Sequence, residues 1–379
     1  MSNTESLMDF LEPVNLSILS DDEGFRASQI GSKITIYDET FPDLEQADVI
    51  IAGCGEYRGG GMASQNFDVA NAVRKHFYSL FHWHKNISIA DIGNIRIGKK
   101  INDSRSAIEN VLADLSRKGR KLVLIGGSHD NTIAQSNAFK KLNRLHQIIT
   151  IDAKIDLDKD SPRFDDNYLL DLFMQSPNFI KHYNHIGFQS YFVHPEMLET
   201  IDKLRFDCFR VGIVKEDMEE MEPIFRDSEM LSLDISAFAN AYAPANTLTP
   251  NGFNGEEMCT LLKFAGLSHT METIGIYGYD YNKDKEELTA KQLSHCLWYL
   301  LDGVYKARQE ATFDDNEHFN EYHLAFTEVQ TVFLQSKKTG RWWMKLPNDT
   351  YIACSYNDYH LASQNEIPER WLRAIEREG

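Results

Sequence analysis

The chain lacks the cysteine pattern of a disulfide-rich or zinc-stabilised protein. Its five cysteines are scattered and odd in number, and none is spaced as C-x-x-C. This spacing argues against a disulfide framework or a structural zinc site, and it fits free thiols in a reducing compartment. The cysteines are Cys54, Cys208, Cys259, Cys296 and Cys354.

Long apolar runs and clustered basic residues are also missing. The sequence has no stretch of about 18 apolar residues, the length that a membrane span needs. Its opening, MSNTESLMDFLEP, carries acids where a signal peptide has bases. A net charge of -18 argues against binding to nucleic acid or to anionic membranes, because both require clustered Lys and Arg. We therefore expect a soluble, cytoplasmic protein.

What the sequence has is a series of short apolar runs that predict strands. The chain is 379 residues long, and 42% of these are hydrophobic, which is ample for a packed core. None of the runs alternates strictly, so we expect strands that are covered on both faces, as in a parallel sheet. The runs are ADVIIAGCG, ISIADIGN, KLVLIGGSH, QIITIDAK, HIGFQSYFV, FRVGIV, MLSLDIS and TIGIYGYD.

Helical patterns lie between these runs. SRSAIENVLADLSRKG predicts a helix with Ser104 as N-cap and Gly119 as its stop, and PEMLETIDKL and GEEMCTLLKFAGL predict two more. Eight strands that alternate with helices predict a three-layer, doubly wound, mostly parallel α/β domain over residues 46–310. Residues 1–45 are expected to be a lead-in segment, and residues 311–379 an aromatic-rich C-terminal appendage.

Chemically reactive side chains follow several of the predicted strands. In an open parallel sheet these residues meet at one edge, beyond the carboxyl ends of the strands. One histidine with several carboxylates suits manganese, iron or zinc. Each residue taken alone has an ordinary alternative, since a strand-end Asp is often a turn or N-cap residue. The residues are His129, Asp152, Lys154, Asp156, Asp234, Ser236, Asp280 and Asn282.

Three of these segments resemble the motifs of the ureohydrolase family, which includes arginase, agmatinase and formimidoylglutamase. GGSHD (126–130), DAKID (152–156) and SLDIS (232–236), followed by YAPA, match GG-D/S-H-S/D, D-A-H-x-D and S-x-D-x-D with its A-P segment. The form of GGSHD is most similar to that of formimidoylglutamase. The resemblance covers about residues 46–285 and implies an arginase-like α/β fold. It also implies attack on a guanidino or formimino carbon by a hydroxide that two manganese ions activate.

By this resemblance, the chain keeps the ligands of one of the family's two metal sites and lacks ligands of the other. It implies that His129, Asp152, Asp156 and Asp234 hold one manganese. The second site requires a histidine and an aspartate where this chain has Lys154 and Ser236. A protonated lysine cannot ligate a metal, and a serine is a poor substitute for a carboxylate. We therefore expect one ion rather than two, with Lys154 as a fixed cation in the place of the missing ion, or no ion at all.

Other family features are weaker in this chain. The segment after DAKID contains no histidine, although the family has a catalytic histidine there. Asp280 matches by position the acid that would pair with the cationic substrate. The strand IGFQSYFV lacks the acids of the corresponding family pattern, and His182, His185 and His194 lie nearby with ordinary structural roles as their simplest explanation.

Two functions remain open. The first is a metal-dependent C–N hydrolase of an amidine or guanidino substrate such as formimidoylglutamate, with Lys154 and Asp280 as catalytic residues. The second is a catalytically inactive family member with a binding, structural or regulatory role, in which Lys154 is a structural counter-ion. For either, the resemblance implies a homo-oligomer.

Overall fold

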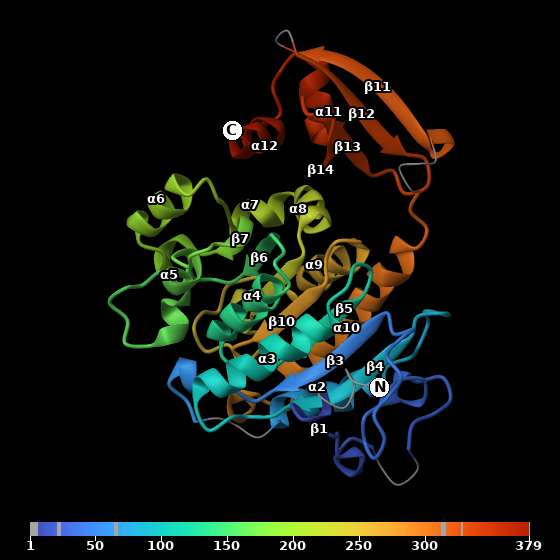
Figure 1. Cartoon of the computed structure of the whole chain (residues 1–379), viewed down its shortest axis with the longest axis vertical. Helices are drawn as coiled ribbons and strands as arrows, with labels where there is room; N and C mark the ends of the chain where they lie inside the picture. The colour runs from blue at the N-terminus through green and yellow to red at the C-terminus, as the bar shows by residue number, and fades with distance from the viewer. Residues whose placement is uncertain (1–6, 21–23, 64–66, 312–315, 327–328, 379) are drawn as a thin grey trace.

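The computed structural model describes residues 7–20, 24–63, 67–311, 316–326 and 329–378, and Figure 1 shows its arrangement. Within these residues the main sheet has ten strands, nine of them in the order β1-β4-β3-β5-β10-β9-β6-β7-β8, with β2 paired to β4. The strands are β1 (Leu11–Glu12), β2 (Thr35–Ile36), β3 (Val49–Cys54), β4 (Ile89–Ile95), β5 (Lys121–Ile125), β6 (His146–Ile151), β7 (Ile180–Phe188), β8 (Asp207–Arg210), β9 (Met230–Asp234) and β10 (Thr273–Tyr277).

Strands β3 to β10 pair in parallel, as the unbroken apolar runs predicted. The lead-in residues contribute the two short strands β1, which is antiparallel to β4, and β2, which is parallel to it. The main-sheet helices are α2 (Asp68–Ser79), α3 (Ile101–Leu115), α4 (Thr132–Lys141), α5 (Tyr168–Phe173), α6 (Pro195–Lys203), α7 (Val211–Glu216), α8 (Glu222–Asp227), α9 (Gly255–Leu267) and α10 (Leu288–Ala307).

Alternate residues of one strand face opposite helical layers. In β5, Val123 and Ile125 join a core cluster with residues of α2, α9 and α10. Leu122 and Leu124 join a second cluster with residues of α3 and α4. Because both faces of the strand are covered, a strand of this kind shows no polar alternation. The chain therefore forms the three-layer, mostly parallel α/β fold that the sequence predicted (Figure 1).

Two local predictions were wrong. Helix α3 begins at Ile101 rather than after Ser104, because the carboxylate of Asp103 accepts the backbone N–H of Lys100 and caps the helix earlier. The run FRVGIV is not one strand: β8 ends at Arg210, and α7 follows directly. A short apolar run fits either a strand or a buried helix, so its periodicity alone could not separate the two.

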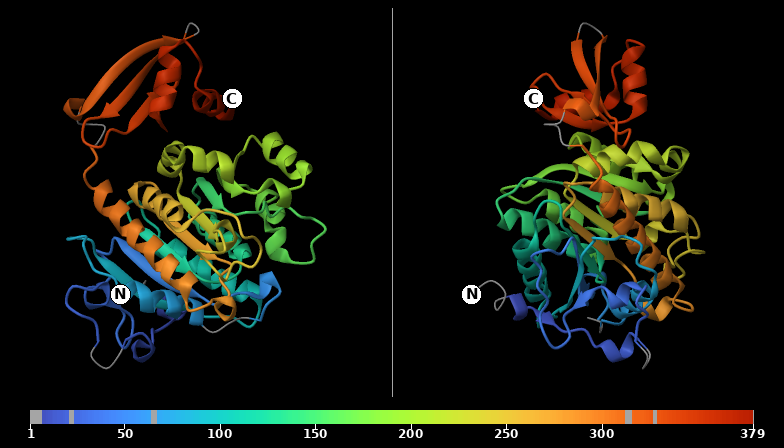
Figure 2. Two further views of the ribbon diagram at one scale, coloured as in Figure 1. Left: turned by 180° about the vertical axis from the view of Figure 1, so that it is seen from behind. Right: turned by 90° about the vertical axis from the view of Figure 1, so that its right-hand side faces the viewer.

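The C-terminal residues build a second, smaller sheet, which lies beyond α7 and α8 in Figures 1 and 2. Its antiparallel strands are β11 (Phe319–Phe326), β12 (Val329–Ser336), β13 (Trp342–Lys345) and β14 (Tyr351–Cys354), and its helices are α11 (Tyr356–Ser363) and α12 (Glu369–Glu378). Phe333, Trp342 and Trp371 belong to its own core. We call residues 316–378 the C-terminal unit. In the described part of the chain, no helix has both the length and the apolar character that a membrane crossing requires.

Candidate metal centre

The histidine of the candidate site follows a tight turn at the end of β5. Gly126 and Gly127 both have positive φ values, +99° and +90°. A Cβ on Gly126 would lie 2.5 Å from the carbonyl oxygen of Cys54, so only glycine fits there. The turn leads directly into the 3₁₀ turn η4 (His129–Asn131), and His129 is buried at its start.

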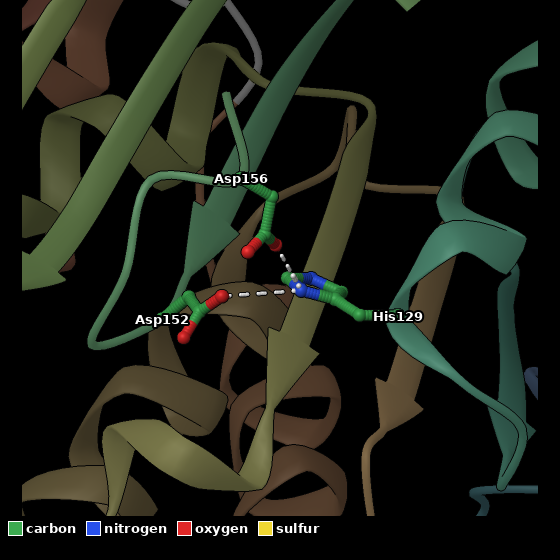
Figure 3. A group of neighbouring side chains, drawn as sticks. All are labelled: His129, Asp152 and Asp156. Atoms are coloured by element: carbon green, nitrogen blue, oxygen red, sulfur yellow. Dashed lines mark ion pairs between the residues drawn. The ribbon is translucent and has the colours of Figure 1, made fainter. Parts of the chain in front are cut away.

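Three carboxylates surround one nitrogen of this histidine, and Figure 3 shows two of them, those of Asp152 and Asp156. The Nδ1 atom of His129 lies 2.9 Å from Asp156 Oδ2, 3.2 Å from Asp152 Oδ2 and 3.9 Å from Asp234 Oδ2. Asp152 and Asp156 follow β6, and Asp234 ends β9, the strand next to β6 in the sheet. The sheet order thus brings together the four residues that the sequence predicted, as parallel strands require.

The opposite nitrogen of His129 is fixed by hydroxyl groups. Its Nε2 atom lies 3.0 Å from Ser232 Oγ and 3.3 Å from the hydroxyl of Tyr168. Thr132 Oγ1 lies 2.6 Å from the same serine oxygen. These contacts hold the ring so that Nδ1 points at the carboxylates. Tyr168 and Thr132 lie on helices α5 and α4, and no strand-end pattern could reveal them.

The electrostatics of the group demand a cation. Burial alone would lower the pKa of His129, but Asp152 and Asp156 raise it well above its ordinary value. Burial and the charge of Asp152 also raise the pKa of Asp156, and they raise that of Asp234 to about 6. Three carboxylates, two buried and one half-buried, therefore compete for the positive charge of one imidazole and of the nearby Lys154.

The donor set fits a single divalent metal ion. Metal–nitrogen and metal–oxygen bonds of about 2.0–2.2 Å place neighbouring ligand atoms roughly 3–3.5 Å apart. The separations of 2.9 and 3.2 Å from His129 Nδ1 lie near this range, and Asp234 is slightly more distant at 3.9 Å. His129, Asp152 and Asp156 form a group whose ligand atoms all lie within 4.8 Å of one another. Nitrogen and carboxylate oxygen are donors suited to manganese, iron or zinc.

Lys154 and Ser236 are both tied to neighbouring acids. The ammonium of Lys154 forms an ion pair with Asp166 and lies 3.9 Å from Asp156 Oδ1. Burial would lower the pKa of Lys154, but Asp156 and Asp152 raise it, so the group stays protonated and cannot ligate a metal. The hydroxyl of Ser236 donates to the carboxylate of Asp152. Asp166 was missed from the sequence, since it lies in a loop segment with no periodic signal.

The remaining candidates have local partners. Asp280 lies three residues beyond β10, accepts the backbone N–H of Asn282 at 3.1 Å and lies 3.5 Å from Lys283 Nζ. His185 lies 3.1 Å from the backbone oxygen of Asp152, and burial lowers its pKa to about 4. His194 caps α6 through the N–H of Glu196.

The fold and this group of side chains define a doubly wound α/β protein with a candidate metal centre at the carboxyl end of its sheet. The family model for the arginase family matches residues 55–300, and the chain belongs to this family. Enzymes of the family, the ureohydrolases, hydrolyse small amidino compounds.

Solved structures with this fold include two formimidoylglutamases. The enzyme from Bacillus subtilis is 15% identical, with a TM-score of 0.63 over 80% of this chain and 99% of that chain. Trypanosoma cruzi formiminoglutamase with Mn²⁺ is 14% identical, with a TM-score of 0.62 over 78% and 99%. Proclavaminate amidino hydrolase from Streptomyces clavuligerus is 17% identical, with a TM-score of 0.57 over 72% and 99%. No curated protein shows significant sequence similarity to the chain.

Proposed function

We propose that this chain is a metal-dependent hydrolase that cleaves a C–N bond of an amidine, and that it holds one metal ion. The observation that carries the proposal is the Nδ1 atom of His129, which faces Asp156, Asp152 and Asp234 at 2.9, 3.2 and 3.9 Å. These four residues would hold the ion. A divalent ion at this place supplies a Lewis acid and lowers the pKa of water, which provides the nucleophile at neutral pH.

The residues of this chain position the reacting groups. Ser236 and the backbone N–H of Lys154 both donate to Asp152, which fixes its second oxygen. The ammonium of Lys154, held by Asp166, provides a permanent positive charge beside Asp156, where relatives with two ions would have the second. Asp280, three residues beyond the end of strand β10, is our candidate for pairing with the cationic amidine.

Formimidoylglutamate is the substrate that we propose, because the GGSHD motif and two solved neighbours are of the formimidoylglutamase type. Manganese is the metal we propose, since the Trypanosoma cruzi neighbour contains it. The five cysteines are free thiols, which supports a cytoplasmic location. We propose a homo-oligomer by analogy with the family.

Two interactions of the site favour a second candidate, a catalytically inactive family member. The Lys154–Asp166 ion pair and the Ser236–Asp152 hydrogen bond neutralise part of the site from within the chain. A site stabilised in this way could have lost its catalytic role and kept a binding or regulatory one.

Metal content and product formation separate the two candidates. We expect protein purified with manganese to carry about one ion per chain and to convert formimidoylglutamate to glutamate and formamide, with urea release from arginine and agmatine as the comparison reactions. His129→Ala is expected to lose both, whereas His194→Ala, outside the site, keeps both. A folded chain with neither metal nor turnover for any of the three substrates would contradict the hydrolase and support the inactive member.

A further inference from the structure

A cavity lies between the main sheet and the C-terminal unit, at the opposite end of the strands from the candidate metal centre. It has a volume of about 440 Å³, within the usual range for small-molecule sites. Gln147 and Lys181, near the starts of β6 and β7, belong to its lining, and so do residues of α11 and α12. Because the metal centre follows the opposite, carboxyl ends of the strands, the cavity is a separate site.

One wall of this cavity is apolar and incompletely covered. Phe209, Ile213 and Ile224 from the main domain face Ile352 and Leu361 from the C-terminal unit. Ile213 is 53% exposed, although it is a large aliphatic residue. Apolar surface that borders an enclosed space gains free energy when an apolar ligand group displaces water from it.

The charged part of the lining is strongly acidic. Six carboxylates line the cavity against three fixed cations, Lys181, Arg370 and Arg373. Arg370 is engaged by Asp358 at 3.0 Å and by Glu220 at 3.2 Å.

The second arginine is engaged as well. Arg373 lies 3.5 Å from Asp207 and 3.6 Å from Glu369. The charge of Lys181 acts on Glu229, outside the lining, and partly counters the burial that raises the pKa of that residue. The two arginines thus engage four of the six lining carboxylates, and the other two, Asp217 and Asp227, form no ion pair within the described residues.

Asp227 is the excess carboxylate that lies at the junction itself. In the described part of the chain its hydrogen-bond donor is one backbone N–H, that of Ala353 at 3.2 Å. The neighbouring Arg226 is directed at Glu222 and at the backbone of Trp342. Burial raises the pKa of Asp227, and the charges of Arg226 and Arg370, which are both directed at other carboxylates, counter this effect only in part.

We propose that this cavity binds a small organic cation: a protonated primary amine that carries a hydrocarbon chain. The ammonium group would pair with Asp227, and the chain would cover the wall formed by Ile213 and Ile224. An anionic ligand would meet an excess of carboxylates, and a purely apolar ligand would cover Asp227 without giving it a direct ion-pair partner. This site does not rest on the hydrolase activity proposed above.

Calorimetric titration with hexylamine tests the proposal on the full chain. We expect saturable binding of hexylamine, and none of hexanoate or ammonium chloride, which carry the chain or the charge alone. Asp227→Asn, which keeps the shape and removes the charge, is expected to weaken binding at least tenfold. Ile213→Gln, at an exposed position, should weaken it about threefold by removing part of the apolar wall.

Asp152→Asn is the control for location, because it alters the metal centre and leaves the cavity intact. We expect it to bind hexylamine as the unaltered chain does. The proposal is overturned if hexylamine does not bind, if Asp227→Asn binds it equally well, or if Asp152→Asn loses binding, which would place the amine at the metal centre.

Discussion

At the scale of single residues, the proposal of one metal ion rather than two depends on Lys154 and Ser236. Lys154 is an ammonium bound to Asp166, and Ser236 is a hydroxyl bound to Asp152. Converting them with Lys154→His plus Ser236→Asp supplies an imidazole and a carboxylate, both good donors for divalent metals. We expect bound manganese to rise from about one to about two ions per chain, measured by elemental analysis after gel filtration.

The single substitution Ser236→Asp provides the comparison for this double variant. Ser236→Asp alone adds a negative charge and leaves the ammonium in place, so we expect it to keep about one ion. If the double variant binds one ion or fewer and melts at a lower temperature, Lys154 is a structural partner of Asp166 and does not replace a metal.

His146 makes stability depend on pH independently of the metal centre. It is buried, its ring stacks on Phe139 at 4.6 Å, and its Nε2 lies 2.9 Å from Ser136 Oγ. Burial lowers its pKa from 6.5 to about 4. Between these values the unfolded chain binds the proton and the folded chain does not, so stability falls as the pH drops.

We expect acidification from pH 7 to pH 5 to cost about 2 kcal/mol through His146 alone. Urea unfolding at both pH values, compared with His146→Gln, isolates this contribution. The comparison concerns the change with pH, so any loss of ring stacking in the variant cancels. Equal losses in the two proteins would show that His146 is not the responsible group.

At the scale of secondary-structure elements, the strands and the grouping of the candidate metal ligands were predictable, and the residues that support them were not. His129, Asp152 and Asp234 each follow or end a buried strand, and parallel strands place such residues at the same edge of the sheet. Asp152 and Asp234 come from the adjacent strands β6 and β9, whereas β10 separates β9 from the strand β5 that precedes His129. Asp166 and Tyr168 reach the same site from a loop and the short helix α5. Their positions depend on the path of the folded chain, for which a local sequence pattern carries no signal.

Helices α9 and α10 pack through two glycines, which permits close contact of their backbones. A Cβ on Gly303 would lie 2.3 Å from the carbonyl oxygen of Lys263 and 2.8 Å from the Cα of Gly266. Gly303→Ala must therefore separate the helices, and we expect it to lower the free energy of unfolding by about 2 kcal/mol. Chemical denaturation measures this change.

Gly212→Ala is the matched control for this substitution. Gly212 also lies in a helix, α7, but an added Cβ would meet nothing within 4 Å. We expect it to be neutral or stabilising by about 0.5 kcal/mol, since alanine restricts the unfolded chain. If Gly303→Ala were equally harmless, the two helices would not depend on close backbone contact.

At the scale of the whole molecule, a buried arginine joins the main sheet to the C-terminal unit. Arg226 in α8 forms an ion pair with Glu222, donates to the backbone oxygen of Trp342 at 2.8 Å and lies 4.4 Å from the ring centre of Trp343. The break in the β/α pattern of the sequence predicted a C-terminal appendage. It gave no sign that Arg226 would contact this appendage, because that contact depends on how the chain folds. The cavity with Asp227 lies at the same junction.

Arg226→Ala is expected to loosen this junction more than a surface substitution does. Within the described residues it leaves the buried Glu222 with Arg341, at 3.4 Å, as its ion-pair partner, and it removes the contact with Trp343. Breaking a buried ion pair costs about 3 kcal/mol, against under about 1 kcal/mol for an exposed pair such as Lys203–Glu199. Lys203→Ala is therefore the control.

Hydrogen exchange locates the effect within the molecule. In Arg226→Ala we expect faster exchange of the amides in β13 and β14, with little change in the central strand β5. The further substitution Glu222→Gln should recover part of the lost stability, because it removes the uncompensated buried charge. Uniformly faster exchange across both sheets would instead mean that the main sheet and the C-terminal unit unfold as one cooperative body, with Arg226 acting on the whole chain rather than on the junction.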